Sequence, residues 1–238
     1  MQSLPDIKGF IKNTLIEWDG MISSEVFLPG CNFRCPYCHS YELFTKPDEI
    51  DAVSWDDVCK YLDEKKGWVD GLVLCGGEPL MSRGILNCLE MLKNRGIKVK
   101  IDTNGYFPEE LQKAIARQLV AYIAMDIKAP LNALEYSRVT GVNNVDILKL
   151  VESINLIKKS GIDYEFRTTM CPVYINKKNV VEIAKSIEGA KKYSLQQFNP
   201  KNCYSTSLRG IKPYLKEEIY EMKKLVAPYV ESCMVKGV

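Results

Sequence analysis

The protein has 238 residues and a mass of 27.1 kDa, a size that suits one domain or one domain with a small appendage. Hydrophobic residues make up 46% and charged residues 26%. This is the composition of a folded globular protein, and it excludes disorder for the bulk of the chain. With 32 basic and 30 acidic residues the net charge is +2. The chain therefore lacks the positive charge with which proteins bind nucleic acid or anionic membranes, and we expect neither partner.

No apolar run approaches the ~20 residues that a membrane-spanning helix needs; the longest, 119–125, has the length of a strand. Residues 1–8 have no basic start followed by an apolar stretch, so a secretory signal is not expected. We therefore expect a cytoplasmic protein whose nine cysteines are thiols or metal ligands.

The single histidine, His39, restricts the chemistry. Catalytic triads, facial triads and histidine-rich zinc sites all use histidine, and most use more than one. Demanding chemistry must therefore come from cysteines, carboxylates, lysines or a bound cofactor.

Along the chain, strand-like runs alternate with helical patterns. The predicted strands are 25–29, 71–75, 98–102, 120–126, 164–170 and 193–198. The predicted helices are 55–64, 85–94, 109–118, 145–159, 178–187 and 215–225. Alternating strands and helices predict a parallel sheet with right-handed crossovers.

The predicted fold class is α/β, a partial (βα)6 TIM-like barrel of parallel strands. A full eight-unit barrel takes ~250 residues, which is more than this chain offers. We expect a single domain over 1–238, with a short lead-in at 1–22 and a C-terminal helical segment at about 212–238. An incomplete barrel has an open side, which could admit a loop of another protein.

Four unusual segments follow predicted strands: 31–38, 76–79, 102–105 and 126–128. In parallel α/β folds, chemistry collects at the carboxyl ends of the strands. We therefore expect these segments to meet at one rim.

The segment 31–38 holds Cys31, Cys35 and Cys38 in a C-x3-C-x2-C pattern. Three such thiolates can bind three irons of a [4Fe–4S] cluster and leave the fourth iron open to a small molecule. Zinc is the competing interpretation, but a structural zinc needs four ligands, and no second C-x-x-C pair is present. Three unliganded cysteines are the remaining alternative. The spacing favours the cluster.

The cysteine motif and the three later segments resemble the motifs of a known superfamily. The C-x3-C-x2-C motif with Tyr37 before its last cysteine, followed in order by GGEP, DTNG and DxK, is similar to the signature of the radical S-adenosylmethionine (SAM) superfamily. Residues 30–39 look most like the activating enzymes of glycyl radical enzymes. Residues 14–23 resemble the lead-in of activating proteins for anaerobic (class III) ribonucleotide reductase. That family more usually has an aromatic residue, Pro and Gly where this chain has Trp18-Asp19-Gly20.

The resemblance implies one [4Fe–4S] cluster on the three cysteines, with SAM bound through its amino and carboxylate groups to the open iron. It also implies a monovalent cation near SAM, held by Asp102, Thr103 and Asp126. The expected SAM-binding residues are Tyr37, Gly76, Gly77, Glu78, Asp102, Thr103, Asn104, Asp126, Lys128 and Arg167.

The residues themselves support some of these roles and leave alternatives. Glu78 could accept from the SAM ammonium, and Lys128 could pair with its carboxylate. The alternatives are a structural network of Asp126 and Lys128, alone or with a glutamate, an arginine–glutamate lattice around Arg167, and packing of Tyr37 on the cysteine loop. Of the other cysteines, Cys59, Cys75 and Cys88 fall at apolar positions and are expected in the core, whereas a second cluster from Cys171, Cys203 and Cys233 is disfavoured.

The expected function is that of a radical SAM iron–sulfur oxidoreductase. It would cleave SAM reductively to a 5′-deoxyadenosyl radical, which abstracts a glycine Cα hydrogen on a partner enzyme. The resemblance implies anaerobic ribonucleotide reductase as that partner, and a flavodoxin or ferredoxin-like protein as electron donor. Alternatives are activation of a pyruvate formate-lyase type enzyme, action on a small molecule or peptide, or a non-catalytic iron–sulfur or zinc module. No catalytic residue is expected beyond the cluster and SAM.

Overall fold

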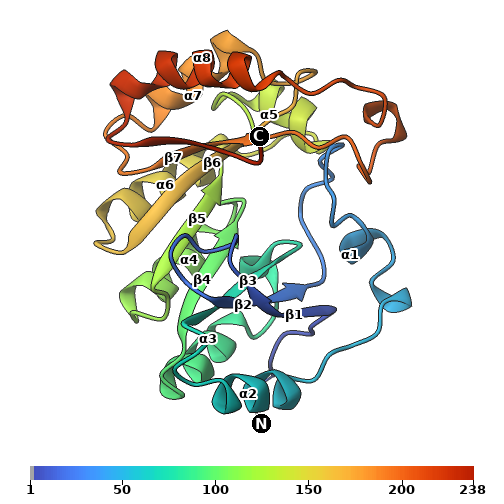
Figure 1. Cartoon of the computed structure of the whole chain (residues 1–238), viewed down its shortest axis with the longest axis vertical. Coiled ribbons are helices and arrows are strands. Elements are labelled where there is room, and N and C mark those ends of the chain that lie inside the picture. The colour runs from blue at the N-terminus through green and yellow to red at the C-terminus, as the bar shows by residue number, and fades with distance from the viewer. Residues whose placement is uncertain (1–2) are drawn as a thin grey trace. The chain divides into compact units, whose positions relative to one another are not determined.

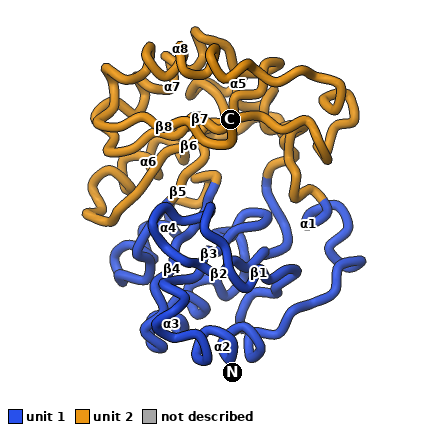
Figure 2. The backbone as a smooth tube through the Cα atoms, viewed as in Figure 1, with its two compact units in different colours: residues 1–32, 42–103, 109–123 blue, residues 33–41, 104–108, 124–238 orange. Residues whose placement is uncertain are grey.

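The structure is a computed structural model (Figure 1), and it describes residues 3–238. The chain divides into two compact units (Figure 2). The first contains residues 1–32, 42–103 and 109–123, and the second contains 33–41, 104–108 and 124–238. In the described part of the chain, no helix is both long and apolar enough to cross a membrane.

The sheet of the first unit positions the first half of the predicted site. Strand β1 (Gly9–Thr14) runs antiparallel to β2 (Ser23–Leu28). Parallel pairing then joins β2 to β3 (Gly71–Gly76), and β3 to β4 (Lys98–Thr103). Every side chain of β3 up to Cys75 is buried. A strand that is covered on both faces has apolar residues at consecutive positions rather than at alternate ones. The sequence GLVLC of β3 has this pattern.

The helices of the first unit follow its strands. They are α1 (Glu42–Thr45), α2 (Trp55–Glu64), α3 (Ile85–Asn94) and α4 (Pro108–Ala116), the last beginning in the second unit. Helix α2 starts where the Ser54 side chain accepts a hydrogen bond from the backbone N–H of Asp56, at 3.1 Å, a standard N-terminal cap. Its buried residues are Val58, Cys59 and Leu62, which lie on one face because the helix repeats every 3.6 residues.

The second unit continues the alternation. Its strands are β5 (Tyr122–Asp126, which enters from the first unit), β6 (Asp163–Met170), β7 (Tyr193–Gln197) and β8 (Cys233–Lys236). Its helices are α5 (Ala133–Thr140), α6 (Ile147–Lys159), α7 (Lys177–Ser186) and α8 (Lys216–Val226). Strands β6, β7 and β8 pair in parallel. Helix α8 packs against both α7 and β8 (Figure 1).

Short 3-10 helices complete the chain at Pro47–Glu49, Pro79–Met81, Thr206–Leu208 and Ala227–Tyr229.

Every predicted strand and helix is present, within three residues at each end. The predicted α/β class with parallel strands is therefore confirmed. Sequence patterns missed β1, α1, α5 and β8. The prediction of a helical segment at about 212–238 is wrong in its last part, because Pro228 follows α8 and Cys233–Lys236 forms a strand beside β7. A single domain over 1–238 stays a prediction, and the first two residues of the predicted lead-in lie outside the described residues.

Candidate functional site

The cysteine loop begins where β2 ends. Gly30 has a left-handed backbone with φ +82°, and its N–H donates to the Leu43 carbonyl at 2.8 Å. Cys31 belongs to the first unit, whereas Cys35 and Cys38 belong to the second. The N–H of Cys38 donates to the Cys35 carbonyl at 2.9 Å. This bond folds the second half of the loop into a tight turn, with Cys35 and Cys38 at its two ends.

Within the second unit, the segment after β7 holds the cysteine loop. The N–H groups of Tyr204 and Ser205 donate to the carbonyls of Cys38 and Pro36, at 2.9 and 2.8 Å. The His39 ring nitrogen Nε2 lies 2.8 Å from the Asn199 carbonyl oxygen. These three bonds fix the backbone around two of the predicted cluster ligands, and nothing in the local sequence of either segment indicated them.

The glycines of the GGEP motif pack directly against the start of the cysteine loop. The N–H of Gly77 donates to the Leu28 carbonyl at 2.9 Å, and the N–H of Glu78 donates to the Gly30 carbonyl at 2.8 Å. Gly76 has φ +110°, and a Cβ there would lie 2.6 Å from the Leu28 backbone nitrogen. Only glycine allows this approach. The GGEP motif therefore packs, within the first unit, against the residues that lead into the cysteine segment.

Glu78 lies in a buried hydrogen-bond network. Its Oε1 accepts from the Thr103 hydroxyl at 2.7 Å and from the Leu80 backbone N–H at 3.1 Å. Glu78 and Thr103 are 1% and 3% exposed, so their positions are set by packing as well as by these bonds. The DTNG motif thus reaches the GGEP motif through Thr103.

Asp102 and Asn104 flank Thr103 and have local partners. The Asp102 Oδ1 lies 2.8 Å from the buried ammonium of Lys100. The Asn104 Oδ1, in the second unit, accepts from the Tyr106 N–H at 3.0 Å, which closes a turn after β4. Sequence reasoning did not single out Lys100, although a lysine inside a strand of alternating character is a signal for a buried ion pair.

Asp126, Lys128 and Arg167 come together in the second unit. The Asp126 Oδ1 lies 2.8 Å from the Arg167 Nε, and its Oδ2 lies 3.3 Å from the Lys128 Nζ. The Lys128 backbone N–H donates to the Tyr136 hydroxyl at 3.0 Å. The Asp126–Lys128 network is therefore present, and Arg167 joins it through an aspartate rather than a glutamate.

This triad shifts the pKa values of its members. Burial alone would raise the pKa of Asp126, but the charges of Arg167 and Lys128 outweigh burial and lower the pKa to about 2. Burial would lower the pKa of Lys128, but Asp126 holds it well above its usual value. All three groups are therefore charged at neutral pH, and together they carry one net positive charge. Such a cluster suits a carboxylate ligand.

Tyr37 is buried in the second unit, with its ring 6.2 Å from that of Tyr174. Tyr174 lies after β6 and outside the cysteine loop, so this partner of Tyr37 differs from the packing on the loop that the sequence left open.

A second buried pair in the first unit was not foreseen. The Cys75 thiol donates to the Glu25 Oε1 at 2.9 Å, and Glu25 is 6% exposed. Burial raises the pKa of Glu25 to about 7, against the opposing effect of the Cys75 hydrogen bond; Glu17 and Asp102 raise it further. The sequence did contain an indication of this pair, because Glu25 is the one carboxylate within the strand SSEVFL.

The six cysteines outside the loop differ in burial. Cys59, Cys75 and Cys88 are buried in the first unit, as predicted. Cys171 and Cys203 are also buried, and Cys233 is partly exposed. No disulfide joins any of the nine cysteines, all of which lie among the described residues.

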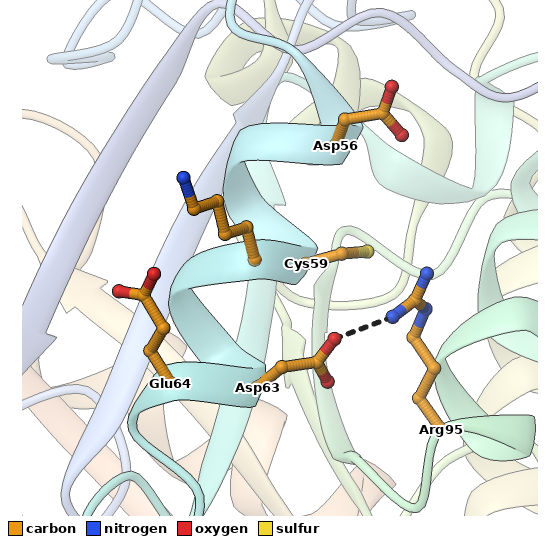
Figure 3. A pocket seen from close by; sticks show the side chains of 6 residues that line it. Asp56, Cys59, Asp63, Glu64 and Arg95 are labelled. Carbon is orange, nitrogen blue, oxygen red and sulfur yellow. Dashed lines mark hydrogen bonds and ion pairs between the residues drawn. The ribbon is translucent and has the colours of Figure 1, made fainter.

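A shallow pocket of about 420 Å³ opens on the first unit between α2 and the end of α3 (Figure 3). Its lining is mostly charged, and Arg95 and Asp63 form an exposed ion pair of 2.8 Å across it. None of the predicted site residues lines this pocket.

The described residues 3–238 contain no preformed group of three or more His, Cys, Asp or Glu side chains that could hold a metal ion. Cys31, Cys35 and Cys38 therefore stay the predicted cluster ligands, on the strength of their spacing in the loop.

The family model described as Radical SAM superfamily matches residues 26–190. The chain belongs to the radical SAM superfamily. It is an enzyme of this type, and the family uses a [4Fe–4S] cluster and SAM. The matched range includes the cysteine loop and the GGEP, DTNG and DxK segments.

Two curated relatives cover most of the chain. A Methanocaldococcus jannaschii protein, provisionally named a glycyl-radical enzyme activating enzyme, is 26% identical over 98% of this chain and 96% of its own length. The pyruvate formate-lyase-activating enzyme of Clostridium pasteurianum is 26% identical over 75% of this chain and 76% of its own.

Among solved structures, Streptococcus suis SuiB bound to SAM aligns with a TM-score of 0.68 and 16% identity. The alignment covers 87% of this chain and 48% of SuiB, so the chain spans about half the length of that protein. The likeness confirms the predicted radical SAM fold with its parallel-strand α/β sheet.

Proposed function

We propose that this protein activates a glycyl radical enzyme. The observation that carries the proposal is the match to the M. jannaschii protein, which extends over 98% of this chain and 96% of that protein. Because neither chain has a large segment outside the alignment, the likeness is not limited to the shared family core. The pyruvate formate-lyase-activating enzyme of C. pasteurianum supports the same class of reaction.

Cys31, Cys35 and Cys38 would hold the cluster. Three thiolates at this spacing suit three irons of a [4Fe–4S] cluster. The Cys35–Cys38 turn and the bonds from Tyr204 and Ser205 support a fixed loop. When bound and reduced, such a cluster would supply the one electron that cleavage of the C5′–S bond of SAM to methionine and a 5′-deoxyadenosyl radical requires.

The residues of each unit would bind SAM through complementary charge. Gly76 and Gly77 bring backbone close to the ligand, and Glu78 would accept from its ammonium. Lys128 and Arg167 would receive its carboxylate, since they exceed Asp126 by one charge. Tyr37, Asp102, Thr103 and Asn104 complete the proposed SAM-binding set.

The finer proposal for the partner is anaerobic (class III) ribonucleotide reductase. It rests on the resemblance of the lead-in, residues 14–23, in which Asp19 stands where that family more usually has Pro. The preceding Trp18, which keeps the usual aromatic character, is 7% exposed and packs with Val73 and Cys75 in the core of the first unit. A flavodoxin or ferredoxin-like protein would supply the electron.

A radical SAM enzyme that acts on a small molecule is the second candidate. The 7-carboxy-7-deazaguanine synthase of Clostridium acetobutylicum is 28% identical, but over 59% of this chain and 65% of its own length. The activating enzymes align over more of the chain, and we therefore favour the protein substrate.

The test is anaerobic reconstitution with iron, sulfide, SAM and dithionite, in the presence of anaerobic ribonucleotide reductase or pyruvate formate-lyase. We expect a glycyl radical doublet in the electron paramagnetic resonance spectrum of the reductase. A reductase whose acceptor glycine is changed to alanine is the matched control and should give no doublet. Cleavage of SAM without a radical on either partner would contradict the activase proposal and favour a small-molecule substrate.

A further inference from the structure

A buried ion pair lies in the first unit at the end of β4. Lys100 is 1% exposed, and its Nζ lies 2.8 Å from the Asp102 Oδ1. Lysine is almost never buried without an anionic partner, because its charge loses the solvation that water provides. Residues two apart in a strand face the same side, so β4 itself places the ammonium beside the carboxylate.

The position of the ammonium is fixed from a second direction. The Lys100 Nζ also donates to the Glu17 backbone carbonyl, in the loop between β1 and β2. The next residue, Trp18, is buried against Val73 and Cys75 of β3. The loop that contains Glu17 is thus anchored in the core, which fixes the carbonyl that accepts from the ammonium.

The resemblance implied a monovalent cation held by Asp102, Thr103 and Asp126, and the residues present do not fit one. Asp102 is paired with Lys100 in the first unit, and the Thr103 hydroxyl donates to Glu78. In the second unit, Asp126 is already paired with both Arg167 and Lys128. Each carboxylate that would attract a cation therefore has a side-chain cation in contact with it.

We propose that the Lys100 ammonium serves as a built-in cation beside Asp102, so that SAM binding by this protein requires no monovalent metal ion. This inference rests on the proposed SAM site. An ammonium is a compact point charge, like a potassium ion, but it is covalently attached and always present. A metal ion on the same carboxylate would place two positive charges within a few ångströms in a buried site, where salt screens weakly.

The first experiment uses the wild-type protein with its cluster reconstituted. SAM affinity is measured by anaerobic equilibrium dialysis in tetramethylammonium chloride, and again in potassium or sodium chloride at equal ionic strength. We expect the dissociation constants to agree within about twofold. A constant that is at least about fivefold lower with potassium or sodium would overturn the inference.

The second experiment removes the charge. Lys100→Met keeps the length of the side chain, and in tetramethylammonium chloride it should weaken SAM binding by about tenfold. Potassium or sodium should restore part of this loss, since the Asp102 carboxylate then becomes available to a metal ion. Unchanged affinity of Lys100→Met would overturn the role of Lys100. The matched control is Lys98→Met, an exposed lysine on the same strand.

These measurements need no partner enzyme. Failure to form a glycyl radical would contradict the proposed function and leave the cation result standing. SAM binding that depends on potassium or sodium would contradict the role of Lys100 as a built-in cation and would leave the proposed function standing. If Lys100→Met does not fold, as judged by circular dichroism, the comparison of salts on the wild type still decides the question.

Discussion

Gly77 lies so close to Gly30 that a Cβ at Gly77 would be 1.7 Å from the Gly30 carbonyl oxygen. The neighbouring Glu78 N–H donates to that same oxygen. The backbone of the GGEP motif and the residue before Cys31 are therefore packed in direct contact, and one cannot move without the other.

Gly77→Ala should destabilise the protein and displace the start of the cysteine loop. Because the obstacle is backbone rather than a flexible side chain, we expect a loss of about 3 kcal/mol in the free energy of unfolding, measured by urea denaturation. Gly210→Ala is the control, since a Cβ there meets nothing within 4 Å. Equal stability of the two variants would show that the contact is not rigid.

Cys35→Ala should abolish both the iron–sulfur absorbance and SAM cleavage. Two remaining thiolates cannot hold a cubane that leaves a single iron open. The control is Cys233→Ala, which removes a partly exposed thiol in β8 and should keep both signals. Retained SAM cleavage in Cys35→Ala would refute the cluster assignment.

Lys128→Ala should weaken SAM binding more than cluster assembly. The loss of one charge-assisted contact corresponds to about 2 kcal/mol, or more than tenfold in the dissociation constant. Asp126 keeps its bond to Arg167 in this variant, so the fold should survive. Iron content and a SAM titration on the same sample separate the two effects, and an unchanged SAM affinity would exclude the proposed role of Lys128.

Glu25 should make stability depend on pH. Its pKa is about 7 in the folded protein and near 4.5 in the unfolded chain, so between these values the folded state binds more protons. The contribution of Glu25 to stability is therefore largest below about pH 4.5, and it falls by up to about 3 kcal/mol as pH rises to about 7. Burial is the main cause; Cys75, Glu17, Asp102 and Lys100 are the other groups that act on the carboxyl.

Glu25→Gln should remove this dependence. Urea denaturation at about pH 5 and about pH 8 should give the variant a smaller drop in unfolding free energy than the wild type. Glu188→Gln, at an exposed position, is the control. An identical drop in wild type and Glu25→Gln would mean that Glu25 does not titrate in this range.

The sequence by itself determined six of the strands, six of the helices and the spacing of the cysteine loop. Local patterns suffice for these features: alternation in KVKID, an apolar run in GLVLC, and the helical period of the segment 85–94 all act within a few residues. The C-x3-C-x2-C spacing is equally local. The short edge strands β1 and β8 were not predicted, because a segment of four to six residues shows little periodicity. Each of them forms a strand by pairing with its neighbour, β2 or β7.

Only the tertiary structure decided how the charged residues are used. Glu25 and Cys75 are 50 positions apart, and Asp126 and Arg167 are 41 apart. Lys100 has Asp102 two residues away but depends on Glu17, 83 positions distant. Whether a charge in a strand meets water, a ligand or an opposite charge depends on what packs over it. That partner comes from another part of the chain, so no local pattern can indicate it.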